Sequence, residues 1–148
     1  MAKITIGIIG CGVIGQRWAA AFAHAGHAVR VFDPAGDTDI YQRDVLPSLL
    51  HDLDMLKGEQ SKPGTIELFP TIAEALSGVD FVQENGPEKI DIKRKLLAEI
   101  ESHIGDEIII ASSSSALLVS DMQVDCRKPD RIILGHPFNP VHLMPLVE

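Results

Sequence analysis

Short apolar runs alternate along the chain with longer segments whose apolar residues recur at helical spacing. The runs Ile4–Ile9 and Ala28–Phe32 are typical of buried strands, and the Ala-rich segment Val13–Ala25 between them predicts a helix that ends at Gly26. The whole unit takes about 30 residues, the length of two parallel strands joined by a crossover helix. The first part of the chain therefore predicts a βαβ unit.

The same alternation continues to the end of the chain. Residues 37–58 have a weaker helical pattern, which Pro47 is expected to break into two short helices, and a polar loop follows over Gly58–Gly64. A capping box begins a short helix over Thr71–Ser77. The remaining elements are four strands and one helix: Ile66–Phe69, Val79–Gln83, Glu107–Ala111, Arg131–Leu134, and Ile90–His103. This order predicts an α/β fold of the Rossmann type, a doubly wound and mainly parallel sheet with helices on both faces.

Composition and charge exclude several classes of protein. The 148 residues, 45% of them hydrophobic, predict a single domain over 1–148. A formal charge of −8 argues against a nucleic-acid or anionic-membrane partner, since the longest basic cluster, Lys93-Arg94-Lys95, fits a solvated helix face. No apolar run reaches the roughly 20 residues that span a bilayer, so a cytoplasmic protein is expected. Two cysteines and scattered histidines predict no metal site.

A glycine-rich loop joins the first predicted strand to the first helix. In the run Gly10-Cys11-Gly12-Val13-Ile14-Gly15, the first glycine allows the tight turn, the second lets backbone amides approach a pyrophosphate, and the third permits close packing of the helix. The amides that begin the helix at Val13 and Ile14, with the positive end of its dipole, stabilise the phosphate charge without a basic side chain.

Asp33 ends the second strand about 20 residues further on, the position of an acidic residue that binds the adenine ribose. No arginine follows it directly to receive a 2′-phosphate, so NAD is favoured over NADP as the cofactor. The alternative is that Asp33-Pro34 only forms a turn and that the glycines serve only packing.

Polar residues cluster where three later strands end: Gln83–Glu88, Ser112–Ser115 and Gly135–Pro140. Ligands of open α/β sheets bind at these carboxyl ends. His136, which leaves a buried strand beside a rigid Pro-Phe-Asn-Pro loop, suits a general base for a secondary alcohol.

The chain resembles the 3-hydroxyacyl-CoA dehydrogenase family over its whole length. The resemblance rests on Gly-Cys-Gly-Val-Ile-Gly, on Glu84, Glu88 and Lys93, on Ala-Ser-Ser-Ser-Ser, and on the motif that runs from His136-Pro-Phe-Asn-Pro to Pro-Leu-Val-Glu148. The family spacings are kept, because Ser115 stands 21 residues before His136, while Asn139 and Glu148 stand three and twelve residues after it.

The resemblance implies a role for each of these residues. His136 takes the proton from the 3-hydroxyl of the substrate while C3 gives a hydride to NAD, and Glu148 orients His136 and stabilises its protonated form. Ser115 binds the reacting oxygen, and Asn139 helps to build the pocket.

Glu88 and Lys93 are placed by the same resemblance at the ribose on the nicotinamide side of the cofactor, and Ser115 is also expected to bind the cofactor. Three structural alternatives stand beside these roles: an N-cap for Ser115, a turn former for Asn139, and a surface ion pair for Glu88 and Lys93.

Family members continue into an all-helical domain with dimer contacts and much of the substrate pocket. The resemblance therefore implies that this chain is truncated, that the full-length protein is a homodimer, and that the isolated domain turns over poorly because its site is open.

The substrate is expected to be a small 3-hydroxy acid, as in the L-carnitine and L-gulonate 3-dehydrogenase branch. Acidic residues over 37–44, with Asp52, Asp54 and Glu59, disfavour the phosphates of CoA. The alternatives are an acyl-CoA dehydrogenase of fatty-acid oxidation, since Lys57 and Lys62 remain to receive CoA, and a non-catalytic NAD-binding module.

Overall fold

The computed structural model describes residues 2–34, 41–58 and 62–148. Within them, parallel strands form one six-stranded sheet in the order β3-β2-β1-β4-β5-β6. The strands are β1 (Thr5–Ile9), β2 (Ala28–Phe32), β3 (Ile66–Leu68), β4 (Phe81–Glu84), β5 (Ile109–Ser112) and β6 (Ile132–Leu134). The predicted strands are confirmed, with ends that differ by one or two residues.

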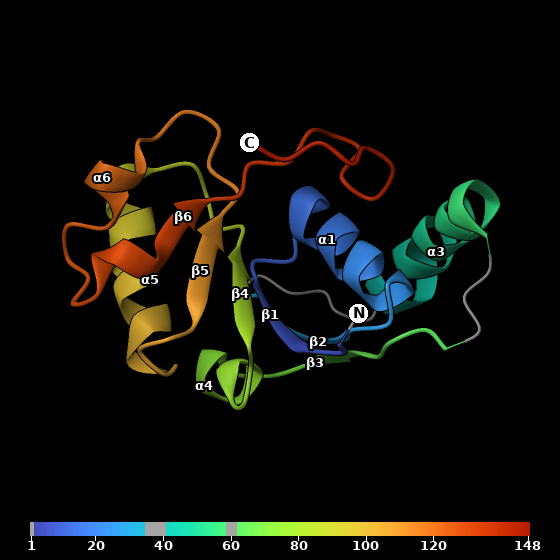
Figure 1. Cartoon of the computed structure of the whole chain (residues 1–148), viewed down its shortest axis with the longest axis horizontal. Coiled ribbons are helices and arrows are strands. Elements are labelled where there is room, and N and C mark those ends of the chain that lie inside the picture. The colour runs from blue at the N-terminus through green and yellow to red at the C-terminus, as the bar shows by residue number, and fades with distance from the viewer. Residues whose placement is uncertain (1, 35–40, 59–61) are drawn as a thin grey trace.

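Helices cover both faces of this sheet (Figure 1). α1 (Val13–His24) and α3 (Leu46–Lys57) pack on one face, whereas α4 (Ile72–Leu76), α5 (Ile90–Ser102) and α6 (Val119–Met122) pack on the other. The predicted doubly wound α/β fold is therefore confirmed. β1 has β2 on one side and β4 on the other, so the chain winds in opposite directions from it and leaves a crevice at the carboxyl ends of the strands.

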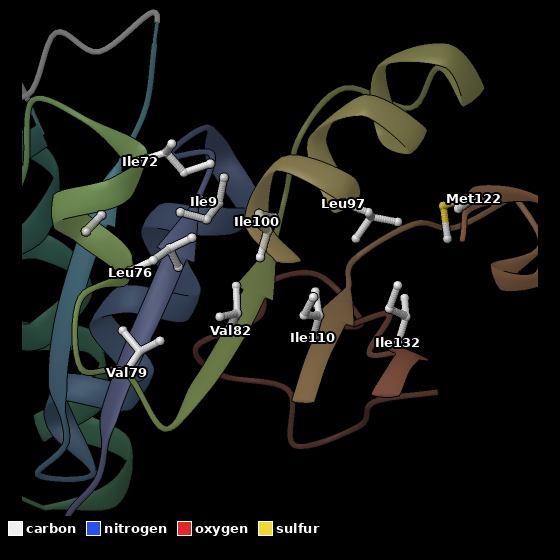
Figure 2. Packing of buried hydrophobic residues seen from close by; sticks show 11 residues of the cluster. Ile9, Ile72, Leu76, Val79, Val82, Leu97, Ile100, Ile110, Met122 and Ile132 are labelled. Atoms are coloured by element: carbon white, nitrogen blue, oxygen red, sulfur yellow. The ribbon is translucent and has the colours of Figure 1, made fainter. Parts of the chain in front are cut away.

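Each face of the sheet has its own apolar core. Figure 2 shows Ile9, Val82, Ile110 and Ile132 on neighbouring strands, beneath Leu97 and Ile100 of α5. Burial of one such side chain stabilises the fold by about 1.5–3 kcal/mol. The other core contains three fully buried alanines of α1, Ala19, Ala20 and Ala23. Because alanine is small, α1 lies close to the sheet, and its first turn is held against the end of β1.

Two helix ends carry the caps that the sequence predicts. Gly26 has a φ of +93°, and its N–H donates to the carbonyl of Ala23 at 2.9 Å, which closes the end of α1. At α4, the Glu74 N–H donates to the Thr71 hydroxyl oxygen at 3.2 Å, and this hydroxyl donates to the Glu74 carboxylate at 2.8 Å.

The prediction of two short helices around Pro47 is wrong. A π-helical turn, Tyr41–Val45, leads into one continuous helix, α3, and Pro47 lies in the first turn of that helix. Proline is tolerated there because an N–H in the first turn has no partner within the helix. Residues 37–40 of the predicted segment lie outside the described residues.

In the described parts of the chain, no helix has the length and apolar character needed to cross a membrane. The same residues contain no group of three or more His, Cys, Asp or Glu side chains placed to hold a metal ion. Cys11 and Cys126 are both free thiols.

Candidate active site

The glycine loop makes the turn from β1 into α1. Gly10 has a φ of +90°, a left-handed conformation that favours glycine. A Cβ at Gly15 would lie 1.9 Å from the carbonyl oxygen of Gly10, so close packing within the protein excludes a side chain there. A Cβ at Gly12 would meet no protein atom within 4 Å. Gly12 is the N-cap residue of α1, a position that favours glycine, and the open space at its Cβ position leaves room for a ligand.

A cleft of about 640 Å³ lies beside this loop, at the carboxyl ends of β1 and β2. Asp33 lies at its wall and accepts a hydrogen bond from the Cys11 N–H at 2.5 Å. Apolar side chains and backbone make up much of the rest of the lining: Ile9, Gly10, Gly12, Phe32, Pro34, Gly86, Pro87, Ile92 and Leu96. Apolar walls suit an adenine ring, and a carboxylate at this place suits ribose hydroxyls. The residues present therefore fit NAD.

Ile92 and Leu96 of α5 are part of this cleft although their spacing predicts only an amphipathic helix. Ile92 is 39% exposed, whereas Leu97 and Ile100 of the same helix are fully buried. Hydrophobic spacing cannot separate a face that packs in the core from one that lines a ligand site.

Both thiols are expected to react slowly in the folded protein. Burial, with a smaller contribution from the charge of Asp33, raises the pKa of Cys11 to about 12, and burial raises the pKa of Cys126 to about 11. Because the thiolate is the nucleophile, iodoacetamide at pH 8 should modify both cysteines at least about 100-fold more slowly in the folded protein than in urea. Mass spectrometry of the alkylated peptides measures this ratio.

The raised pKa values also set a sign for the pH dependence of stability. An unfolded thiol loses its proton near pH 9, whereas the folded Cys11 keeps it to about pH 12. This contribution to the free energy of unfolding is complete below pH 9 and is lost as the pH rises towards 12. If iodoacetamide modified either thiol of the folded protein at pH 8 as fast as in urea, the raised pKa of that thiol would be contradicted.

A second pocket, of about 340 Å³, lies at the other end of the glycine loop. It is lined by Ile14, Ser113, Ser115, His136, Pro137, Phe138 and Asn139. The structure thus brings the predicted residues Ser115, His136 and Asn139 together from two separate strand ends, next to the first turn of α1.

Glu148 is held beside His136 by the backbone. The His136 N–H donates to the Glu148 carbonyl at 3.1 Å, and the Glu148 N–H donates to the His136 carbonyl at 2.9 Å. The side chains of this antiparallel pair meet, with 3.2 Å between His136 Nδ1 and Glu148 Oε2. An ionised carboxylate only accepts hydrogen bonds, so Nδ1 carries the proton and the lone pair of the neutral ring is on Nε2.

Ser113 joins several polar side chains behind this pocket. Its hydroxyl donates to Asn85 Oδ1 at 2.7 Å and accepts from Gln83 Nε2 at 2.8 Å and from Trp18 Nε1 at 3.3 Å. These contacts join the ends of β4 and β5 to α1. The sequence marks the polar strand ends but does not single out Ser113, because the serines of the run look alike in sequence.

Arg17, on the second turn of α1, is a further residue that sequence reasoning missed. Its guanidinium donates to Asn139 Oδ1 at 2.7 Å. No described acidic side chain lies within ion-pair distance of Arg17. A positive charge therefore stands next to a residue that lines the His136 pocket.

The assignment of Lys93 to a solvated basic face is wrong. Lys93 is 1% exposed, and its ammonium donates to both carboxylate oxygens of Glu84, at 3.0 and 2.8 Å. A buried charge needs such partners, since burial of an unpaired ion is costly. Lys93 and Glu88 are 4.0 Å apart but do not form a surface pair, because only Glu88 reaches solvent. The Lys93 ammonium therefore neutralises the carboxylates of Glu84 and Glu88.

Glu88 lies at the serine loop that follows β5. Partial burial raises its pKa, but hydrogen bonds from Ser114, Ala116 and Ser115 and the charge of Lys93 lower it, and the net result is a pKa below the usual value. Glu88 is therefore ionised at neutral pH.

The structural alternatives for Ser115 and Asn139 come out differently. Ser115 is not an N-cap, because the next helix, α6, begins at Val119 with Leu118 as its N-cap. Asn139 lies in a bend, before a cis bond to Pro140, and it also lines the pocket.

Comparison with known proteins agrees with a cleft that fits NAD. Residues 5–148 match the family described as 3-hydroxyacyl-CoA dehydrogenase, NAD binding domain. An L-carnitine dehydrogenase of Nocardiopsis dassonvillei is 42% identical over 145 residues, which are 97% of this chain and 44% of that protein. An L-carnitine dehydrogenase of Bacillus cereus is 40% identical over 149 residues, 99% of this chain and 44% of that protein. The chain thus spans less than half the length of these relatives.

Solved structures resemble the chain over its whole length. A 5-formyl-3-hydroxy-2-methylpyridine 4-carboxylic acid 5-dehydrogenase, an NAD⁺-dependent dismutase, matches with a TM-score of 0.90 and 32% identity, covering 99% of this chain and 48% of its own. An (S)-3-hydroxybutyryl-CoA dehydrogenase of Ralstonia eutropha matches with a TM-score of 0.80 and 28% identity, covering 99% of this chain and 53% of its own.

Proposed function

Since this chain belongs to the 3-hydroxyacyl-CoA dehydrogenase family, as its NAD-binding domain, we propose that the protein oxidises the 3-hydroxyl of a small free 3-hydroxy acid to a ketone, with NAD as the hydride acceptor. The observation that carries this proposal is the contact of His136 with Glu148 at 3.2 Å, because His136 lines the pocket at the nicotinamide end of the glycine loop. A protein that only senses or stores NAD has no use for such a proton-transfer pair.

The residues of the pocket divide the reaction between them. His136 removes the hydroxyl proton through Nε2, while Glu148 holds the ring by Nδ1 and stabilises the positive charge that the ring gains. The Ser115 hydroxyl donates to the same substrate oxygen, and Asn139 lines the pocket beside it. NAD, when bound, accepts the hydride that leaves C3 as the C3–O bond becomes a carbonyl. The substrate thus loses one proton to His136 and one hydride, with its electron pair, to NAD, which is a two-electron oxidation.

A free carboxylate on the substrate is supported by Arg17. Its guanidinium is anchored to Asn139 at 2.7 Å by one N–H, which leaves further N–H groups to bind an anion. L-carnitine, the substrate in the names of the relatives at 42% and 40% identity, carries its carboxylate two carbons from the hydroxyl carbon. The name of the solved relative at 32% identity also describes a free carboxylic acid.

The acidic residues in and before α3 are expected to repel the phosphates of CoA less than their number in the sequence suggests. Asp44 pairs with Arg43 at 2.8 Å, and two further aspartates of α3 contact buried histidines, at 3.1 Å for Asp54 and 3.4 Å for Asp52. The charge of Arg43 reduces the repulsion that Asp44 exerts on a phosphate, and the contacts with histidine rings occupy oxygen atoms of Asp54 and Asp52. Residues 37–40 and Glu59 lie outside the described residues. The preference for a free acid therefore rests on Arg17 and on the relatives.

A panel of four substrates tests this proposal. The protein expressed from its own gene is assayed for NADH formation with L-carnitine, L-gulonate, 3-hydroxybutyrate and 3-hydroxybutyryl-CoA. We expect kcat/KM to be highest for one of the free acids. A higher value for the CoA thioester would favour the alternative of fatty-acid oxidation, and no turnover of any of the four would overturn the proposed reaction.

An Arg17 variant extends the same assay. Arg17→Met should raise KM for the preferred free acid about tenfold, which corresponds to about 1.4 kcal/mol, while kcat changes little. Lys95→Met removes an exposed positive charge from α5 and serves as the matched control. An unchanged KM in Arg17→Met would show that Arg17 does not bind the substrate. The proposed oxidation would then still be tested by the substrate panel.

Three expectations about the whole protein remain proposals. Residues 1–148 form one NAD-binding domain, the protein acts in the cytoplasm, and it is a homodimer through the helical domain that follows this domain in the family.

A further inference from the structure

We propose that Glu88 is a positioning residue, which holds the serine loop so that the Ser115 hydroxyl faces His136. This inference rests on the proposed function, because it gives Ser115 its partner in the reaction. It differs from the role that the family resemblance implies for Glu88, which is contact with the cofactor ribose. The geometry that supports it is the set of donors around one carboxylate oxygen.

Three donors of the serine loop converge on Glu88 Oε1. They are the Ser114 hydroxyl at 2.6 Å, the Ser115 N–H at 3.0 Å and the Ala116 N–H at 2.9 Å. The Ser114 oxygen in turn accepts from the Leu117 N–H at 3.2 Å. Hydrogen bonds to an ionised acceptor are about twice as strong as neutral ones. The loop is therefore wrapped around a single oxygen atom.

The second oxygen of Glu88 lies near a buried ion pair, which Lys93 forms with Glu84. Lys93 Nζ lies 4.0 Å from Glu88 Oε2 and is itself held by the fully buried Glu84. Glu84 also accepts from the Ser112 hydroxyl at 2.6 Å and from the Gly86 N–H at 2.5 Å. Buried charges stabilise one arrangement only when they are fully paired, as these are. The ends of β4 and β5 and the start of α5 are thus locked together beneath the serine loop.

The start of the serine loop is held by the hydrogen bonds of Ser113, whereas the hydrogen bond described for Ser115 itself is the one from its N–H to Glu88. β5 ends at Ser112, and the next helix begins at Val119, so Ser115 lies in neither element. Ser115 is exposed and lines the pocket with His136. Without the Glu88 carboxylate, its backbone N–H loses its acceptor. A displacement of about 1 Å at a reacting group can lower the rate about 100-fold.

A double-mutant cycle separates positioning from cofactor binding. Glu88→Ala, Ser115→Ala and the double variant are compared for kcat and for the Kd of NADH. We expect Glu88→Ala to lower kcat about 10- to 100-fold and to change the Kd of NADH less than about threefold. In the Ser115→Ala background it should lower kcat no more than about twofold, because the residue that it positions is already missing.

Two further variants complete the experiment. Glu88→Gln keeps an acceptor oxygen for the loop and should recover much of the lost kcat. Glu67→Gln, at an exposed site on β3, is the control for loss of a carboxylate. Additive losses in the cycle, or a Kd of NADH raised tenfold with kcat unchanged, would overturn the proposal, and the latter would make Glu88 a cofactor ligand.

Amide hydrogen exchange tests the contact without turnover. In the 148-residue chain, Glu88→Ala should speed exchange at the Ser115 and Ala116 amides about tenfold or more while the amides of β1 keep their protection. If the wild-type protein oxidised no 3-hydroxy acid, the proposed function would be contradicted. The exchange rates at Ser115 and Ala116 would still test whether Glu88 holds the serine loop. Unchanged exchange at both amides would contradict the role of Glu88 itself.

Discussion

His136→Ala is expected to lower turnover of the 3-hydroxy acid at least about 100-fold, the usual scale for loss of a general base. Among the described residues that line the pocket, His136 is the one with a basic ring nitrogen that can act as a general base. The Kd of NADH should stay within about threefold, because other residues line the cofactor cleft. A fall in kcat with unchanged NADH binding places the defect in the chemical step.

Stopped-flow measurement of NADH formation and fluorescence titration with NADH give these two quantities. The matched control is His103→Ala, since His103 is exposed at the end of α5, away from the pocket. It should keep both wild-type values. If His136→Ala retained turnover within tenfold of the wild type, His136 would not be the base.

Alanine at the second and third glycines of the loop should produce opposite defects. Gly15 lies inside α1, where replacement of glycine by alanine ordinarily stabilises a helix by about 1 kcal/mol. The added Cβ would, however, approach the Gly10 carbonyl oxygen to 1.9 Å, so the helix and the turn must move apart. We expect Gly15→Ala to destabilise the protein by about 3 kcal/mol, the upper range for overpacking, and to lower Tm by about 6–12 °C.

Gly12→Ala should leave the fold intact and weaken the binding of the cofactor. Gly12 has a φ of −69°, which any residue adopts, and no protein atom lies within 4 Å of its Cβ position. The methyl group would instead occupy the space where the pyrophosphate meets the first turn of α1. Because Gly12 is the N-cap of α1, where alanine is less favourable than glycine by about 1 kcal/mol, we expect Tm to fall by only about 2–4 °C, whereas the Kd of NADH should rise at least about tenfold.

Thermal unfolding and NADH titration of both variants distinguish these effects. Opposite results, with Gly12→Ala unstable and Gly15→Ala stable, would show that the glycines have exchanged roles. Normal NADH binding by Gly12→Ala would show that the pyrophosphate does not approach this position.

Much of the fold can be predicted from the sequence because the strands at the centre of the sheet are largely buried on both faces. Continuous apolar runs such as Ile4–Ile9 and Ala28–Phe32 are then recognisable without partners. The prediction at Pro47 was wrong because the effect of a proline depends on its position in the helix. Pro47 lies in the first turn of α3, directly after a π-helical turn that the sequence pattern did not predict.

The candidate site divides in the same way. The glycine loop is local, and its three glycines have backbone reasons that a short motif records. The pairing of His136 with Glu148 came only through the family resemblance, and the structure supplies its reason, an antiparallel pair of backbone segments. Lys93 reads as a surface charge in a basic triplet, and only the position of Glu84 on the neighbouring strand shows it to be buried.

The order of strands and helices, the glycine loop and the polar strand ends can be read from the sequence alone, because they depend on residues that are near one another in the chain. Which distant side chains meet depends on the packing of the folded chain: Arg17 contacts Asn139, and Glu88 contacts the serine loop. These contacts join residues 122 and about 27 positions apart. Their geometry is set by how β4, β5 and α1 pack, and the spacing of residues along a chain does not record packing.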